Sequence, residues 1–89
     1  MKRREFTAEL LSNDAVIARV TKYAWNSAIH GSESLVRMHA RAMGEPYEGT
    51  LPRIDGHREH GRGDGIYLRD WHGLRTGQRL TARVLERAS

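Results

Sequence analysis

The sequence predicts an α+β fold in a single domain that spans residues 1–89. Three observations carry this prediction. Residues 6–43 contain one glycine and place apolar residues at helical spacing, whereas residues 44–77 hold eight of the nine glycines and both prolines. Residues 78–89 return to a helical pattern. We therefore expect N-terminal helices, a central glycine-rich β-hairpin and a basic C-terminal helix.

A helical turn at 6–11 and a longer helix over about 14–30 are the first expected elements. Asp14 and the polar residues before it can cap the longer helix. Its main apolar face is formed by Val16, Ile17, Val20, Tyr23 and Ala24. Trp25 and Ile29 project almost opposite this face. An apolar side chain off the main face marks a second buried side or a partner surface, so Trp25 and Ile29 are candidate interface residues.

A second helix is expected over about 33–43. Gly31 would stop the preceding helix, Ser32 would cap this one, and Gly44 follows its last turn. The predicted inner face carries Leu35, Met38, Ala42 and Met43, with His39 among them.

The glycine-rich middle of the chain predicts a β-hairpin over about 52–71. We expect one strand at about 52–59, a tip at 60–65 and a return strand at about 66–71. Trp71 shares a face of the return strand with the aromatic ring of Tyr67, and is a third candidate interface residue.

The final segment allows two patterns. Strand alternation would group Leu80, Ala82 and Val84 but would leave Leu85 beside a charged residue. A helix over about 77–88 instead gathers the apolar side chains on one side. We therefore expect a helix, with Thr76 as its cap.

Arginines recur at every fourth position of this segment, and thirteen of the fifteen basic residues of the chain are arginine. On a helix, Arg75, Arg79, Arg83 and Arg87 would form a stripe with a rise of about 6 Å between members, close to the spacing of phosphates along a nucleic-acid strand. Arg62, at the hairpin tip, is a further candidate phosphate contact. The net charge of +4 agrees with an anionic partner, although a solvated helix face would have the same pattern.

His57 and His60, with Asp64 and His72 nearby, are the candidate metal ligands. His57 and His60 are three positions apart, so on a strand their side chains would point to opposite faces. The chain contains no cysteine, which excludes a thiolate site. We expect neither a bound metal nor a cofactor.

No paired carboxylates, nucleophile–base pair or phosphate-binding glycine motif stands out, so we expect a binding protein rather than an enzyme. The leading hypothesis is a small basic regulatory protein that binds nucleic acid through the arginine stripe and the hairpin tip. The alternative is an inhibitor, of the kind carried by phages and other mobile elements, that docks on a host protein or a protein–nucleic acid complex. We further expect a homo-oligomer in the cytoplasm, with no membrane-spanning segment.

Overall fold

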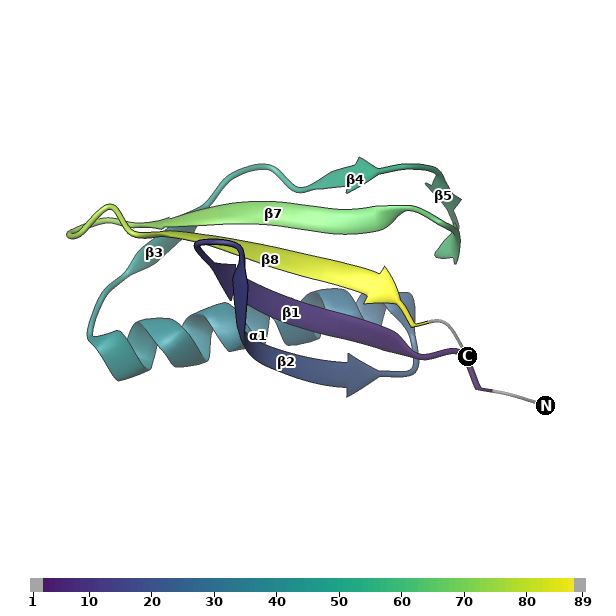
Figure 1. Cartoon of the computed structure of the whole chain (residues 1–89), viewed down its shortest axis with the longest axis horizontal. Helices are drawn as coiled ribbons and strands as arrows, with labels where there is room; N and C mark the ends of the chain where they lie inside the picture. The colour runs from purple at the N-terminus through teal and green to yellow at the C-terminus, as the bar shows by residue number, and fades with distance from the viewer. Residues whose placement is uncertain (1–2, 88–89) are drawn as a thin grey trace.

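The computed structural model describes residues 3–87 and shows one helix packed on a six-stranded antiparallel sheet (Figure 1). This confirms the α+β class but not the predicted N- and C-terminal helices. The elements in chain order are β1 (Phe6–Ser12), β2 (Ala15–Lys22), α1 (Trp25–Met43), β3 (Tyr47–Gly49), β4 (Arg53–Asp55), β5 (Arg58–Glu59), β6 (Arg62–Gly63), β7 (Ile66–Gly73) and β8 (Arg79–Glu86).

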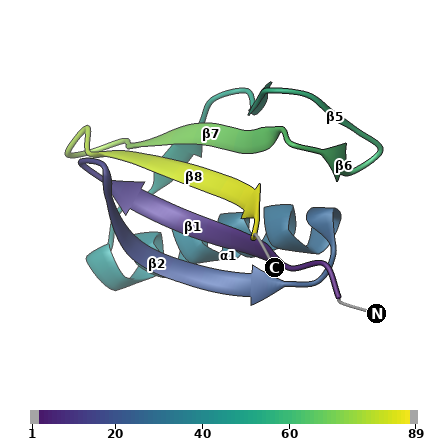
Figure 2. The ribbon, with the colours of Figure 1, turned by 45° about the vertical axis from the view of Figure 1, so that its right-hand side comes forward.

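The sheet has the strand order β2-β1-β8-β7-β3, and β4 also pairs with β7. The last strand, β8, therefore lies between the first strand and β7 and ties the two ends of the chain together. Figure 2 shows α1 on one face of this sheet, behind β1 in this view. No element among the described residues covers the other face. Antiparallel sheets often leave one face open to solvent in this way.

The core lies between α1 and the sheet, in two adjoining clusters. The fully buried apolar side chains come from alternate positions of β1 and β8, with Tyr67 of β7 and two residues of α1: Phe6, Ala8, Leu10, Ala28, Val36, Tyr67, Leu80, Ala82 and Val84. No helix within residues 3–87 is long and apolar enough to cross a membrane.

The prediction of a helix over 14–30 was wrong for residues 14–24. Asn13 and Asp14 both adopt positive φ, 52° and 64°, and form the two-residue turn of the β1–β2 hairpin instead of a helix cap. Residues 6–11, expected as a helical turn, lie in the strand β1. Only the part from Trp25 onward is helical.

The predicted helix over 33–43 is the second half of α1, and its end is confirmed. Gly44 closes the helix in the left-handed conformation, with φ 62°. Gly31 does not stop the helix as expected. It is buried inside α1, where a Cβ atom would lie 3.2 Å from Cγ1 of Val20, so the missing side chain lets α1 and β2 pack closely.

The C-terminal helix over 77–88 was also a wrong prediction, because residues 79–86 form the central strand β8. Its register places Leu80, Ala82 and Val84 on the helix-facing side of the sheet. Leu85 lies on the other face with Arg83. This placement of Leu85 beside a charged residue was the reason for predicting a helix instead of a strand. Residue 88 of the predicted helix lies outside the described residues.

The central hairpin is confirmed in part. β4 pairs antiparallel with β7 as expected, with Arg53 opposite Leu68. Residues 56–65, which we call the arm, do not form a simple tip. They fold into a small hairpin of their own, β5–β6, which turns at His60 and Gly61.

Candidate functional site

A cavity of about 710 Å³ lies at one end of the molecule, where α1 begins and the arm folds back. Figure 2 shows the arm, the start of α1 and the end of β8 at this same end. Segments distant in sequence line the cavity: Arg4, Phe6, Tyr23, Ala24, Trp25, Asn26, Ile54, Arg58, His60 and Gly61.

Arg58 holds the arm against the start of the helix. Its side chain is only 3% exposed, and its guanidinium lies 4.2 Å from the centre of the Trp25 ring. It donates hydrogen bonds to the carbonyl oxygens of Gly61 at 2.7 Å and Gly65 at 2.8 Å. Because Trp25 packs edge-on against Phe6 of the core, this cation–π contact fixes the arm to the rigid part of the fold.

The cavity carries an excess of positive charge. Arg4 donates two hydrogen bonds to Glu86, at 2.6 and 2.9 Å, and Arg58 approaches the same carboxylate at 3.6 Å. Hydrogen bonding from Arg4 lowers the pKa of Glu86, so this carboxylate is ionised at neutral pH. Two guanidinium groups therefore share one carboxylate. Among the described residues that line the cavity, none is acidic.

The first turn of α1 adds to this positive potential. The N-cap residue, Ala24, makes no side-chain capping hydrogen bond, and the first turn contains no acidic residue. The leading backbone N–H groups of a helix have no partner within the helix and carry the positive end of its dipole. An anion in the cavity could accept hydrogen bonds from such groups.

Tyr23 provides an aromatic surface beside these charges. It lies in the connection between β2 and α1, lines the cavity and is 54% exposed. The guanidinium of Arg3 lies 4.7 Å from the centre of its ring. The cavity thus combines cations with an accessible aromatic ring.

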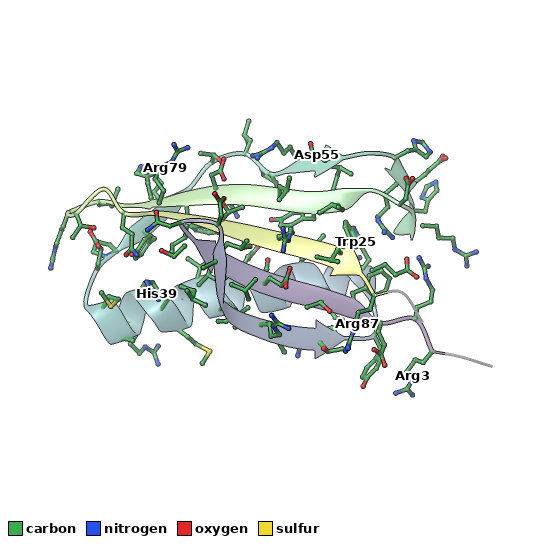
Figure 3. All side chains as sticks on the ribbon, viewed as in Figure 1. Arg3, Trp25, His39, Asp55, Arg79 and Arg87 are labelled. Atoms are coloured by element: carbon green, nitrogen blue, oxygen red, sulfur yellow. The ribbon has the colours of Figure 1, made fainter. Side chains whose placement is uncertain are left out.

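The predicted arginine stripe exists on a strand and not on a helix. Arg79, Arg83 and Arg87 lie on the uncovered face of the sheet, about 13 Å apart at the rise of a β-strand. Arg83 binds Glu9 at 2.7 Å and Arg87 lies 3.8 Å from Glu5. Figure 3 shows Arg79 and Arg87 at opposite ends of β8. Two of these three charges are therefore paired, and the phosphate-like spacing of 6 Å is lost.

The two remaining predicted arginines lie at opposite ends of the molecule. Arg62 is exposed on β6 of the arm, at the cavity end. Arg75 lies in the β7–β8 turn, where its Nη1 donates to the carbonyl oxygen of Gly44 at 3.3 Å. Because the molecule measures 45 × 21 × 20 Å, one phosphate group cannot reach both.

The three predicted interface residues lie on the helix-facing side of the sheet. Trp25 packs between Phe6 and Tyr67, and Ile29 packs against the same core cluster. The expected outward projection of these two residues assumed a helix from residue 14, so that argument no longer holds. Trp71 is partly buried under the guanidinium of Arg69, at 4.3 Å.

The histidines do not converge. His57 and His60 are exposed on the arm, and Nε2 of His60 lies 3.7 Å from Glu59. His72 lies far along β7, opposite Arg79 in the neighbouring strand. Within residues 3–87, no three histidine or acidic side chains are close enough together to hold a metal ion. The expected lack of a metal stays a prediction.

Sequence patterns alone missed Arg4, Tyr23 and Arg58 as members of one site. A usable signal was the pair His60-Gly61, a two-residue turn that lets the arm fold back on itself. No local pattern indicates that this arm meets the start of α1, because that contact depends on the pairing of β4 with β7.

Comparison of the chain with protein-family models, curated proteins and solved structures finds no match. Residues 3–87 form an α+β fold of one helix on a six-stranded antiparallel sheet, with a cavity lined by arginine and aromatic side chains at the start of the helix.

Proposed function

We propose that the protein binds nucleic acid and that the cavity at the start of α1 receives a phosphate group. The observation that carries this proposal is the charge of the cavity, where Arg4 and Arg58 share the single carboxylate of Glu86 and none of the described lining residues is acidic. A phosphate would accept hydrogen bonds from a guanidinium and from the first turn of the helix.

The arm extends this site outward. Arg62 is exposed on β6, two residues beyond His60, so a polyanion that places one phosphate in the cavity could place a neighbouring phosphate on the arm. Arginine suits this role because its planar group binds phosphate through two donors. Arg83 and Arg87 are not part of the proposed site, since each has a carboxylate partner, Glu9 or Glu5, whereas Arg4 and Arg58 have one carboxylate, Glu86, between them. Arg79 lies toward the opposite end of the molecule (Figure 3).

The test compares two exposed arginines at opposite ends of the molecule. Fluorescence polarisation with labelled oligonucleotides should show affinity that falls steeply with salt, since each neutralised phosphate releases counterions. Arg4→Ala should weaken binding to all sequences and reduce the magnitude of the log–log salt slope by about 0.7 to 0.9. Arg4→Lys should retain most of the slope, and Arg79→Ala should bind as the parent does. No binding at low salt, or equal losses for Arg4→Ala and Arg79→Ala, would refute this site.

Exposed apolar side chains favour a second candidate, docking on a partner protein. Leu51, between β3 and β4, is 89% exposed, and Leu74 and Met43 are also largely exposed. An inhibitor of a host protein or of a protein–nucleic acid complex would use such side chains as contacts. If no oligonucleotide binds, this becomes the better proposal, and Leu51→Ser should then weaken binding to the partner. The predicted homo-oligomer and the expected lack of enzymatic activity stay predictions.

A further inference from the structure

We infer that the cavity admits an unstacked base, so that the partner is a single-stranded nucleic acid. This inference rests on the proposed function, because it names the kind of nucleic acid that the same site would bind. It starts from the position of Tyr23. Among the Phe, Trp and Tyr side chains of residues 3–87, Tyr23 is the one that is largely exposed, and it lines the cavity.

The other Phe, Trp and Tyr rings in this part of the chain are less exposed. Phe6 and Tyr67 are buried in the core, and Trp25, Tyr47 and Trp71 pack against it. The uncovered face of the sheet carries none of these rings, as the strand register shows. It instead carries aliphatic side chains such as Leu68 and Leu85 and ion pairs such as Arg83–Glu9 and Arg53–Asp70. Of the described Phe, Trp and Tyr rings, the one most accessible to a base therefore lies at the cavity and not on the sheet.

The walls of the cavity suit a base and a phosphate together. Ile54 is partly exposed and lines the cavity with Tyr23, which gives two apolar contacts for a flat ring. Arg4, Arg58 and the first turn of α1 supply the positive charge for the attached phosphate. The volume of about 710 Å³ lies within the range of cavities that bind small molecules.

A duplex cannot use this arrangement in full. Its bases are stacked on one another inside the helix, so it would present phosphates to Arg4 but no free ring to Tyr23. A single strand can turn one base outward, and stacking of a base on an aromatic side chain is tolerant of sequence. The structure thus favours single strands with little sequence preference.

The test measures affinity for a single strand and for the duplex of the same sequence at one salt concentration. We expect the single strand to bind at least about tenfold more tightly, and Tyr23→Ala to weaken single-strand binding by about 5- to 150-fold, the range for one stacked base. Tyr23→Phe should bind as the parent does, and the affinity of Tyr23→Ala for the duplex should be unchanged. Leu74→Ala, an exposed apolar truncation at the opposite end, is the matched control and should have no effect.

Two outcomes separate this inference from the proposed function. If single strand and duplex bind equally well, or if Tyr23→Ala binds the single strand as the parent does, the inference is wrong while nucleic-acid binding stands. If neither form binds at low salt to a protein with a native circular dichroism spectrum, the proposed function fails and the inference fails with it.

Discussion

Glu45 illustrates at the residue scale how a buried charge fixes the end of the molecule opposite the cavity. Its carboxylate accepts hydrogen bonds from the hydroxyl of Thr76 at 2.6 Å and from the backbone N–H of Arg75 at 2.8 Å, and also from the N–H of Thr76. Gly73 makes room for it, since a Cβ atom there would lie 2.6 Å from the carboxyl carbon. The carboxylate thereby ties the end of α1 to the β7–β8 turn.

This contact should make stability depend on pH. The hydrogen bond from the Thr76 hydroxyl, followed by those from the backbone N–H groups, lowers the pKa of Glu45. A carboxyl group whose pKa is lower in the folded state stabilises the fold above its unfolded pKa, about 4.3, and this contribution is lost as the pH falls through the folded pKa. We therefore expect Glu45→Gln to lower the unfolding temperature by several degrees at pH 7, with a smaller difference at acid pH.

Thermal unfolding of parent and Glu45→Gln between pH 7 and pH 2.5 provides the measurement. The pKa of Glu86 is also lowered, but Glu86 titrates in both proteins, so the difference between the two curves isolates Glu45. A difference in unfolding temperature that stays constant across this range would show that the charge of Glu45 does not contribute.

At the element scale, the sequence predicted the end of α1 and one strand pair but not the other strands. Gly44 ends α1 where expected, because a left-handed residue closes a helix through local hydrogen bonds. The β4–β7 pairing followed from the alternation and the glycines between the strands. Asn13 and Asp14 misled the prediction, since the same residue types cap helices and form two-residue hairpin turns.

β8 shows why the remaining elements could not be predicted. Leu80 and Val84 lie four residues apart, which suits one face of a helix and one face of a strand equally. This segment is a strand because it pairs with β1 and β7. Neither its pairing with β1, at the other end of the sequence, nor that with β7 can be seen in its own residues. The cavity was missed for the same reason, because its residues come together only after the sheet has formed.

A substitution of Ala82 can distinguish the observed strand β8 from the helix that the sequence predicted for this segment. In β8 it is fully buried between the sheet and α1, whereas a helix would turn it away from Leu80 and Val84. Ala82→Asp should therefore cost at least about 3 kcal/mol, the penalty of an uncompensated buried charge. Thr21→Asp, at an exposed strand position, should cost no more than about 1 kcal/mol. Denaturant unfolding measures both, and an Ala82→Asp variant as stable as Thr21→Asp would contradict the strand.

At the scale of the whole molecule, the basic residues are divided between two ends and a sheet face. Figure 3 shows Arg3 and Trp25 at the cavity end and Arg79 toward the other end. Acidic side chains pair with most of the arginines on the sheet face, so the net charge of +4 does not form one continuous basic surface. The cavity is distinguished by combining unbalanced cations, a helix start without a side-chain cap and an exposed aromatic ring.

The most direct test of this account is an NMR titration of the ¹⁵N-labelled protein with a short single-stranded oligonucleotide. If the cavity is the binding site, the largest amide shift changes will fall at residues 23–26, where α1 begins, and at residues 58–62 of the arm. Residues 72–79, at the opposite end of β7 and β8, should not respond. The cavity would not be the binding site if the shift changes were centred on residues 72–79. The same conclusion would follow if no shift changes appeared at oligonucleotide concentrations that saturate binding in fluorescence polarisation.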